Sequence, residues 1–212
     1  MPDFARLRER MVARQIVARG IDDPALVAAM GRVPREMFVA AGHEDAAYDD
    51  RALPIEAGQT ISQPYVVALM ISAAEVGAGD HVLEVGAGSG YAAAVLGQVA
   101  GDVVAIERHG ELARLAAERI EGLGYDNVRI VAGDGVGGWP EAAPYDAILV
   151  PAQCRQAPPA LVGQLKPGGR MVMPVGGRWA GQSLVKYTKA EDGRLLRETL
   201  CEVRFVPLVG AE

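Results

Sequence analysis

Cysteine and histidine are scarce in this chain of 212 residues, which contains two cysteines and three histidines. Cys154 and Cys201 cannot build a disulfide framework. The thiols and imidazoles are also too scattered for a zinc site, so we expect no bound metal. The charged N-terminal stretch does not resemble a signal peptide, and no apolar run is long enough to cross a membrane. These absences favour a protein of the reducing cytoplasm that has no membrane partner.

Positive charge is not in excess either, because 27 acidic residues outnumber 21 basic ones and leave a formal net charge of −6. General nucleic-acid binders are basic, so we expect no nucleic-acid partner. Half of the residues are apolar, and the length suits a single domain with a full core. We therefore expect a globular protein. We also expect it to be a monomer.

The clearest local pattern is a glycine-rich turn between two apolar segments. Residues 81–85 are predicted to form a short buried strand and residues 91–99 a helix, joined by Gly-Ala-Gly-Ser-Gly at 86–90. Such a turn can bind a nucleotide, since glycines allow a ligand to approach main-chain N–H groups. Tyr91 occupies the third glycine position of the dinucleotide fingerprint G-x-G-x-x-G, so the pattern disfavours a dinucleotide.

The spacing G-x-G-x-G after an acid, Glu84, is similar to the first motif of methyltransferases that use S-adenosylmethionine. The methionine part of that molecule carries an ammonium and a carboxylate. An acid beside free N–H groups suits both charges. The structural alternative is an ordinary glycine-rich turn between a strand and a helix.

Strand and helix patterns alternate along the rest of the chain. Helices are predicted over 3–19, 24–30, 66–74, 111–123 and 159–165, and further strands over 103–106, 128–131, 145–150, 170–175, 184–188 and 200–206. We predict an α/β fold: a Rossmann-like doubly wound sheet, mostly parallel, with antiparallel C-terminal edge strands and an N-terminal helical cap. Residues 1–75 form the cap and a first core helix within the same domain, and residues 76–212 form the nucleotide-binding core.

Acidic residues follow the next two predicted strands. Glu107 lies about 20 residues beyond the first glycine, the distance at which an acid meets ribose hydroxyls, and Asp134 follows the third strand. Because the carboxyl ends of parallel strands meet at one edge of a sheet, the glycine turn and both acids should lie together. This arrangement indicates an adenosine-type ligand.

The segment before the glycine turn offers two interpretations of one serine. Ser62 stands where a helix N-cap is expected, with Pro64 in the first turn, so a purely structural role is one of them. The other comes from a wider resemblance of the chain. Residues 58–64, Gly-Gln-Thr-Ile-Ser-Gln-Pro, match a signature of the protein-L-isoaspartate O-methyltransferase family.

The chain resembles this family over nearly its whole length. Supporting stretches lie at 83–91, 133–135 with Trp139, 143–148, 165–169 and 203–208. The resemblance implies a class I methyltransferase that takes a methyl group from S-adenosyl-L-methionine and leaves S-adenosyl-L-homocysteine. The implied acceptor is the free α-carboxylate of L-isoaspartyl residues in damaged proteins and peptides. The resulting ester would then lose methanol to a succinimide without the enzyme.

The resemblance also implies roles for individual residues. It makes Ser62 the active-site serine, which orients the substrate carboxylate through a hydrogen bond and is not a nucleophile. The implied cofactor-binding positions are Gln59, Thr60, Ile61, Tyr65, Glu84, Gly86, Gly88, Ser89, Glu107, Arg108, Asp134 and Gly135. The implied substrate positions are Ile61, Ser62, Ala152, Val206 and Leu208. A carboxylate is ionised at neutral pH, so the chemistry needs positioning and desolvation but no general base.

One departure from the family concerns the substrate. Residues 150–154 read Val-Pro-Ala-Gln-Cys where the family usually has V-T-A-A or V-G-A-A. Proline removes a backbone donor and stiffens a loop that borders the substrate site in the family. A related carboxyl methyltransferase that acts on a dedicated aspartyl peptide therefore remains an alternative. So do a nicotinamide oxidoreductase, which Tyr91 disfavours, and a non-catalytic cofactor-binding protein, which would not need Ser62.

Overall fold

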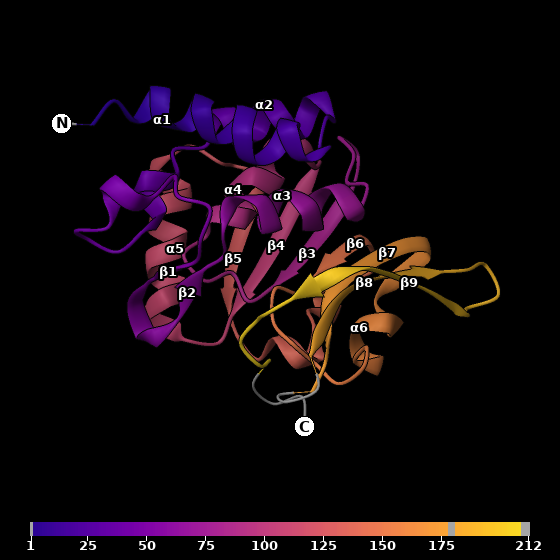
Figure 1. Ribbon diagram of the computed structural model, residues 1–212. Coiled ribbons are helices and arrows are strands. Elements are labelled where there is room, and N and C mark those ends of the chain that lie inside the picture. Colours follow the sequence, from indigo (N-terminus) through magenta and orange to yellow (C-terminus); the bar gives the residue numbers. More distant parts are fainter. Residues whose placement is uncertain (1, 178–180, 209–212) are drawn as a thin grey trace.

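A seven-stranded sheet runs through the centre of the structure, a computed structural model that describes residues 2–177 and 181–208. The strands lie in the order β5-β4-β3-β6-β7-β8-β9 (Figure 1). Their bounds are β3 His81–Val85, β4 Asp102–Glu107, β5 Val128–Ala132, β6 Tyr145–Leu149, β7 Leu165–Gly176, β8 Gln182–Lys189 and β9 Leu195–Val203. The first five pair in parallel, whereas β8 and β9 pair antiparallel. The predicted mostly parallel sheet with antiparallel edge strands is confirmed.

Helices cover both faces of the sheet, as a doubly wound fold requires. One face packs against α3 (Pro64–Ala73), α4 (Tyr91–Val99) and α5 (Gly110–Gly122), and the opposite face packs against the short α6 (Pro159–Gly163). The N-terminal helices α1 (Phe4–Met11) and α2 (Pro24–Arg32) lie outside α3 and α4 as a further layer (Figure 1). Within the described ranges, no helix is long and apolar enough to cross a membrane.

The N-terminal segment forms the predicted cap. The helix expected over 3–19 is α1, continued by a π turn and a 3-10 turn until Gly20, whose φ of 86° ends it. Asp23 caps α2 as predicted, because its side chain accepts a hydrogen bond from the Leu26 main-chain N–H at 2.7 Å. Buried cap residues such as Met11 and Met30 belong to the same apolar cluster as Val82 and Val103 of the sheet. The cap and the sheet therefore share one core.

The segment between α2 and α3 contains short elements. It holds 3-10 turns at Arg35–Phe38, Glu44–Ala46 and Glu56–Gly58, and a two-stranded sheet of β1 (Leu53–Pro54) and β2 (Thr60–Ile61). Further 3-10 turns follow β5, at Gly135–Gly137 and Pro140–Ala142. The loop-rich character predicted for 31–61 is confirmed.

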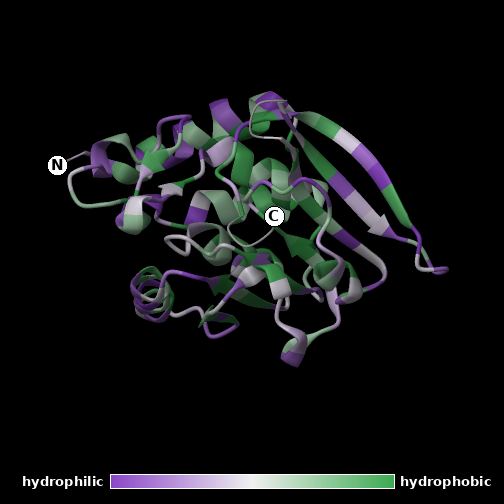
Figure 2. Cartoon of the chain, turned by 90° about the horizontal axis from the view of Figure 1, so that it is seen from below, coloured by the Kyte–Doolittle hydropathy of each residue, from purple (hydrophilic) through white to green (hydrophobic). Residues whose placement is uncertain are grey.

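Hydropathy distinguishes the inner strands from the edge. Figure 2 shows the central strands as mainly hydrophobic, whereas β8 and β9 alternate hydrophilic and hydrophobic residues along their length. Central strands are buried on both faces by helices and need no alternation, but an edge strand remains partly solvated. This difference explains why the inner strands β3, β4 and β6 were predicted to within one residue at either end.

Three C-terminal predictions have the wrong bounds. The helix predicted over 159–165 ends at Gly163, and β7, predicted over 170–175, already begins at Leu165. The strand predicted over 200–206 is β9, which spans Leu195–Val203. The residues that follow β9 leave the seven-stranded sheet, and Pro207 forms an isolated parallel bridge with Gln153. There the Gln182 side chain hydrogen-bonds the Phe205 main chain in place of a strand partner.

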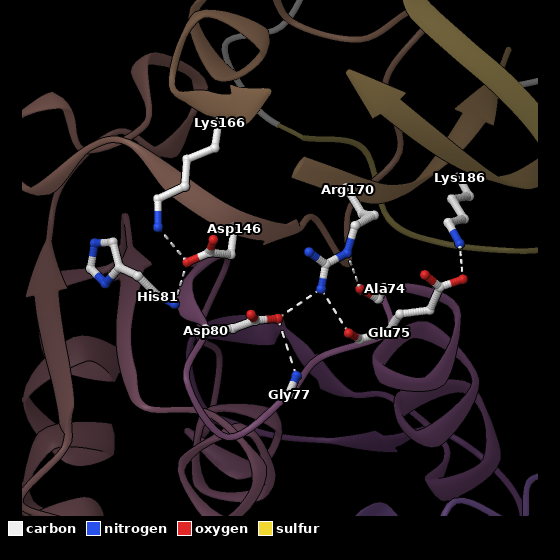
Figure 3. Close-up of polar contacts among 9 residues, drawn as sticks. All are labelled: Ala74, Glu75, Gly77, Asp80, His81, Asp146, Lys166, Arg170 and Lys186. Atoms are coloured by element: carbon white, nitrogen blue, oxygen red, sulfur yellow. Dashed lines mark hydrogen bonds and ion pairs between the residues drawn. The ribbon is translucent and has the colours of Figure 1, made fainter. Parts of the chain in front are cut away.

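An arginine anchors α3 to the sheet at the end opposite the glycine turn (Figure 3). Arg170 of β7 donates from Nε to the Ala74 carbonyl at 2.8 Å, and from Nη2 to the Glu75 carbonyl and to Asp80 Oδ2, both at 2.7 Å. Beside it, Asp146 Oδ2 accepts from the His81 main-chain N–H at 2.8 Å. These contacts fix the end of α3 and the start of β3, the two elements whose other ends form the site described next.

Candidate active site

The glycine turn at the end of β3 has the conformation that its sequence predicts. Gly86, Gly88 and Gly90 have φ values of 97°, 55° and 90°, a region that L side chains rarely adopt. The main-chain N–H groups of Gly86 and Ala87 both donate to the Ile106 carbonyl of β4, at 2.7 and 2.9 Å. A Cβ added at Gly86 would meet nothing within 4 Å, so this part of the turn faces open space.

Three hollows meet in front of this turn. The turn cavity, about 70 Å³, lies between the glycine turn, residues 60–62 and α3. The acid cavity, about 100 Å³, lies over the carboxyl ends of β4 and β5 and includes Glu107 and Asp134. The outer groove, about 690 Å³, lies between the start of α3 and the segment around Val203. Thr60 and Pro151 line all three, so the hollows adjoin one another.

Glu84 is the acid of the turn cavity. Leu83 and Val85 pack in the cluster on the α6 side of the sheet, so Glu84 points to the opposite side, towards α3 and α4. The residue is 1% exposed, and its Oε2 is buried without a hydrogen-bond partner among the described residues. Burial, and then the neighbouring charge of Glu107, raise the pKa of the Glu84 carboxyl well above its usual value. A buried carboxyl of this kind suits a cationic ligand group.

Glu107 lies at the junction of the turn and the acid cavity. Its Oε2 accepts from the Gly88 main-chain N–H at 3.0 Å, and its Oε1 accepts from the His109 main-chain N–H at 2.9 Å. The residue is 5% exposed and lines the acid cavity. It therefore has a structural task as well as a position suited to a ligand.

Because Glu107 both accepts main-chain hydrogen bonds and lines the acid cavity, replacing it should affect stability as well as cofactor binding. From the sequence, Glu107→Ala is expected to weaken cofactor binding and to leave the apo-protein unaffected. The two hydrogen bonds predict an added loss of about 1–3 kcal/mol in the free energy of unfolding, because two main-chain donors lose their acceptor. We expect S-adenosyl-L-homocysteine to bind more weakly by about 2–3 kcal/mol, measured by calorimetry beside urea unfolding. Unchanged affinity would leave Glu107 a purely structural acid.

Asp134, Gly135 and Arg108 complete the acid cavity. Asp134 follows β5, is exposed, and accepts from the Val136 main-chain N–H at 3.1 Å. Gly135 packs on the end of β3 so closely that an added Cβ would stand 2.4 Å from Val85 Cγ1. Only a glycine fits there without displacement. The predicted meeting of the glycine turn with the acids of two following strands is present in the structure.

Ser62 lines both the turn cavity and the outer groove. It lies between β2 and α3, and the N-cap of α3 is Gln63, which makes no capping hydrogen bond with its side chain. The prediction of Ser62 as an N-cap is therefore wrong. The main-chain oxygen of Ser62 accepts from Arg35 Nη2 at 2.8 Å. With capping excluded, the feature that distinguishes Ser62 is its position at the boundary of the turn cavity and the outer groove.

The remaining candidate residues divide among the hollows. Those on the turn cavity are Thr60, Ile61, Gly86, Gly88 and Ser89, and those on the acid cavity include Gln59, Arg108, Ala152 and Leu208. Val206 lines both the acid cavity and the outer groove. Tyr65, implied as a cofactor residue, lines the outer groove instead, where the Arg19 guanidinium carbon lies 3.2 Å from its ring centroid. Ala152 and Leu208, implied as substrate residues, lie beside Glu107 and Asp134.

One residue of this region was placed only in part from the sequence, and another was missed. The resemblance put Pro151 in a loop that borders the substrate site in the family, and the structure places it on all three hollows. Arg35 follows Val33-Pro34 and resembles a surface residue, yet it is fully buried. Its carbonyl partners are set by the tertiary fold, so no local pattern could have identified it.

Comparison with known proteins gives consistent matches. The family model described as protein-L-isoaspartate(D-aspartate) O-methyltransferase matches residues 6–212. Protein-L-isoaspartate O-methyltransferase 1 of Rhodopseudomonas palustris (strain HaA2) is 55% identical over 209 residues, 99% of this chain and 85% of the relative. Protein-L-isoaspartate O-methyltransferase 2 of Pelobacter propionicus is 53% identical over 205 residues, 97% of this chain and 91% of the relative.

Solved structures agree with these matches. A protein-L-isoaspartate O-methyltransferase has a TM-score of 0.88 at 31% identity, over 96% of this chain and 66% of that one. A putative enzyme of the same name from Plasmodium falciparum, solved in complex with S-adenosyl-L-homocysteine, has a TM-score of 0.81 at 25% identity. That match covers 95% of this chain and 97% of the other.

Proposed function

Since the chain belongs to the protein-L-isoaspartate(D-aspartate) O-methyltransferase family, we propose that its three adjoining hollows hold the two reactants of one methyl transfer. The enzyme transfers the methyl group of S-adenosyl-L-methionine to the free α-carboxylate of L-isoaspartyl residues in damaged proteins. One observation carries the assignment of the hollows: Ser62 stands on both the turn cavity and the outer groove. A donor at that boundary can hold a carboxylate of one reactant against the other.

The residues of the turn cavity and the acid cavity fit the cofactor. Glu84, with a buried and unpartnered oxygen, would hold the ammonium of the methionine part. Glu107 and Asp134 would accept from the ribose hydroxyls and from the adenine amine. When bound, S-adenosyl-L-methionine supplies a methyl group carried on a sulfonium.

Ser62 then acts by orientation and not by proton removal. Its hydroxyl donates a hydrogen bond to one oxygen of the substrate carboxylate, and the other oxygen is left free to attack. That carboxylate is ionised at neutral pH, so no base is required. The titratable groups lining the turn cavity are Glu84 and Tyr91, and burial raises the pKa of both. Apolar neighbours such as Met70 and Leu149 exclude water there.

Pro151 bears on which substrate the groove accepts. It lines all three hollows and has no N–H to donate to a bound backbone. We expect an isoaspartyl peptide to be methylated and its normal aspartyl twin to remain unmodified. The two peptides differ in where the free carboxylate lies relative to the main chain, and the groove is expected to bind only the isoaspartyl arrangement. A methylation assay of the two peptides tests this. Faster methylation of the aspartyl twin would favour the alternative of a dedicated aspartyl substrate.

The identity of the bound nucleotide is tested by comparing two ligands. We expect calorimetry to show S-adenosyl-L-homocysteine binding and no binding of NAD, because Tyr91 starts α4 where a dinucleotide fold needs a third glycine. Binding of NAD without binding of the adenosyl compound would contradict the assignment of the cavities.

We propose three further properties, each with its own test. The first is that the protein is a monomer, which light scattering tests. The second is a cytoplasmic location, which the unpaired thiols of Cys154 and Cys201 support and which cell fractionation tests. Residues 1–75 and 76–212, whose outermost residues lie outside the described ranges, belong to one domain because they share a core cluster. A single urea transition would support that domain, and two separate transitions would contradict it.

A further inference from the structure

Arg35 is the largest of the fully buried side chains, with an exposed fraction of 0%. It begins the 3-10 turn Arg35–Phe38 in the N-terminal segment, and none of the three hollows includes it. Arginine is almost never fully buried unless it is paired with an opposite charge. Its position therefore needs an explanation beyond packing.

The guanidinium of Arg35 connects segments that are distant in sequence. Its Nε donates to the Ala47 carbonyl at 2.7 Å, and its Nη2 donates to the Ser62 carbonyl at 2.8 Å. Its central carbon lies 4.6 Å from the ring centroid of Tyr91, the first residue of α4. Both Ser62 and Tyr91 line the turn cavity, so Arg35 supports two walls of that cavity from behind.

The charge of Arg35 faces main-chain carbonyls and an aromatic ring. Among residues 2–177 and 181–208, no aspartate or glutamate forms an ion pair with it, and its Nη1 is buried without a hydrogen-bond partner. Burying an unpaired charge costs several kcal/mol. If the side chain served only stability, an apolar side chain of similar volume would be more favourable. The cost of burying the charge therefore indicates that Arg35 is needed for the main-chain segments to which it donates hydrogen bonds.

We propose that Arg35 is a positioning residue for methyl transfer, which fixes the main chain at Ser62 so that the serine hydroxyl points to the boundary of the turn cavity and the outer groove. This inference rests on the proposed role of Ser62. A main chain held by a charge-assisted hydrogen bond is more rigid than one held by neutral contacts. A misplacement of about 1 Å at a reacting group can cost about a hundredfold in rate.

Arg8 provides a matched control in the same cap. It also crosses between segments, with Nε donating to Tyr48 Oη at 2.8 Å and Nη1 donating to the Arg32 carbonyl at 3.1 Å. It has a carboxylate partner, Glu36, at 3.2 Å, and it contacts neither Ser62 nor a cavity residue. If kcat fell because the cap as a whole was loosened, Arg8→Gln would lower kcat as well. If kcat fell because Ser62 was misplaced, Arg8→Gln would leave kcat unchanged.

The test measures kcat and KM for an isoaspartyl peptide, the affinity for S-adenosyl-L-homocysteine, and urea unfolding. We expect Arg35→Lys and Arg35→Gln to lower kcat by about tenfold to a hundredfold, because the Ser62 carbonyl loses its guanidinium donor. The affinity for S-adenosyl-L-homocysteine should change by less than about threefold, because the cofactor residues are untouched. Arg8→Gln should keep kcat.

A double-variant cycle separates positioning from general packing. If Arg35 acts through the serine hydroxyl, then Arg35→Lys should lower kcat by less than about threefold once Ser62→Ala is present. Independent, multiplicative losses would overturn the inference and leave the role of Ser62 intact. A fully active Ser62→Ala enzyme would instead overturn that role together with the inference. Failure of both Arg35 variants to fold would show a purely structural arginine and would also overturn it.

Discussion

Replacing Ser62 with alanine is expected to lower turnover by about tenfold to a thousandfold, the effect of losing one well-placed hydrogen-bond donor. The reason is its position, because Ser62 stands between the turn cavity and the outer groove, where the two reactants must meet. Affinity for S-adenosyl-L-homocysteine should survive, since the acids of the cofactor cavities remain. Steady-state kinetics and calorimetry on the same preparation measure both quantities.

Stability distinguishes this role from that of a helix cap. Loss of an N-cap costs about 1 kcal/mol, but the N-cap position of α3 is Gln63 and not Ser62. We therefore expect Ser62→Ala to change the free energy of unfolding by less than about 0.5 kcal/mol. Asp23 is the matched control, because its side chain caps α2 at 2.7 Å and lies outside the three hollows. Asp23→Ala should lose about 1 kcal/mol and keep its turnover.

Ser62→Asp sharpens the comparison. Aspartate is as good a cap as serine, so a capping role would leave this variant stable and active. In the orienting role it should be less active than Ser62→Ala, because its carboxylate would face the carboxylate of the substrate and repel it. A fully active Ser62→Asp enzyme would contradict the proposed role.

Much of this site could be predicted because its parts are local. The turn from Gly86 to Gly90 is set by residues that tolerate positive φ, and a parallel sheet brings the ends of β4 and β5 beside it. Both facts follow from short sequence patterns. Glu107 and Asp134 therefore lie together on the acid cavity as predicted, beside the turn cavity that Glu84 lines.

Other features depended on contacts that no pattern encodes. β9 was placed about five residues too late because it is an edge strand, with charged residues such as Arg197 and Glu198 exposed on a partly solvated surface. The start of α3 was misjudged because Ser-Gln-Pro allows a cap at either of two residues. Arg35 escaped notice because its partners, two main-chain carbonyls and an aromatic ring, lie 12 to 56 positions away along the chain.

Glu84 leads to the second large effect, which is a pH dependence of cofactor affinity. Burial and the nearby Glu107 raise the pKa of Glu84, so the free protein keeps this carboxyl protonated above the ordinary glutamate value of 4.5. An ammonium held against it favours the ionised form and lowers that pKa again. The complex therefore binds fewer protons than the free protein, and affinity rises with pH until the pKa of the free protein is passed.

Glu84→Gln isolates this contribution. The amide cannot ionise, so we expect the affinity for S-adenosyl-L-homocysteine to fall by about 1.5–3 kcal/mol at high pH, the worth of a charge-assisted hydrogen bond. The affinity should also rise less steeply with pH, because the ionisation of Glu84 no longer contributes to that rise. Calorimetry in two buffers of different ionisation heat should show fewer protons released than in the unchanged protein. Glu118→Gln, at an exposed ion pair on α5, is the matched control and should behave like the unchanged protein.

The apo-protein should respond in the opposite direction. A carboxyl whose pKa is raised on folding binds its proton more tightly in the folded state, so stability falls as pH rises from 4.5 towards the raised pKa. Glu84→Gln removes this loss, and above that interval the variant should unfold at a higher urea concentration than the unchanged protein. Weaker binding together with greater apo stability is the pattern expected of a site residue kept at a cost to the fold. Loss of both would instead make Glu84 an ordinary structural residue.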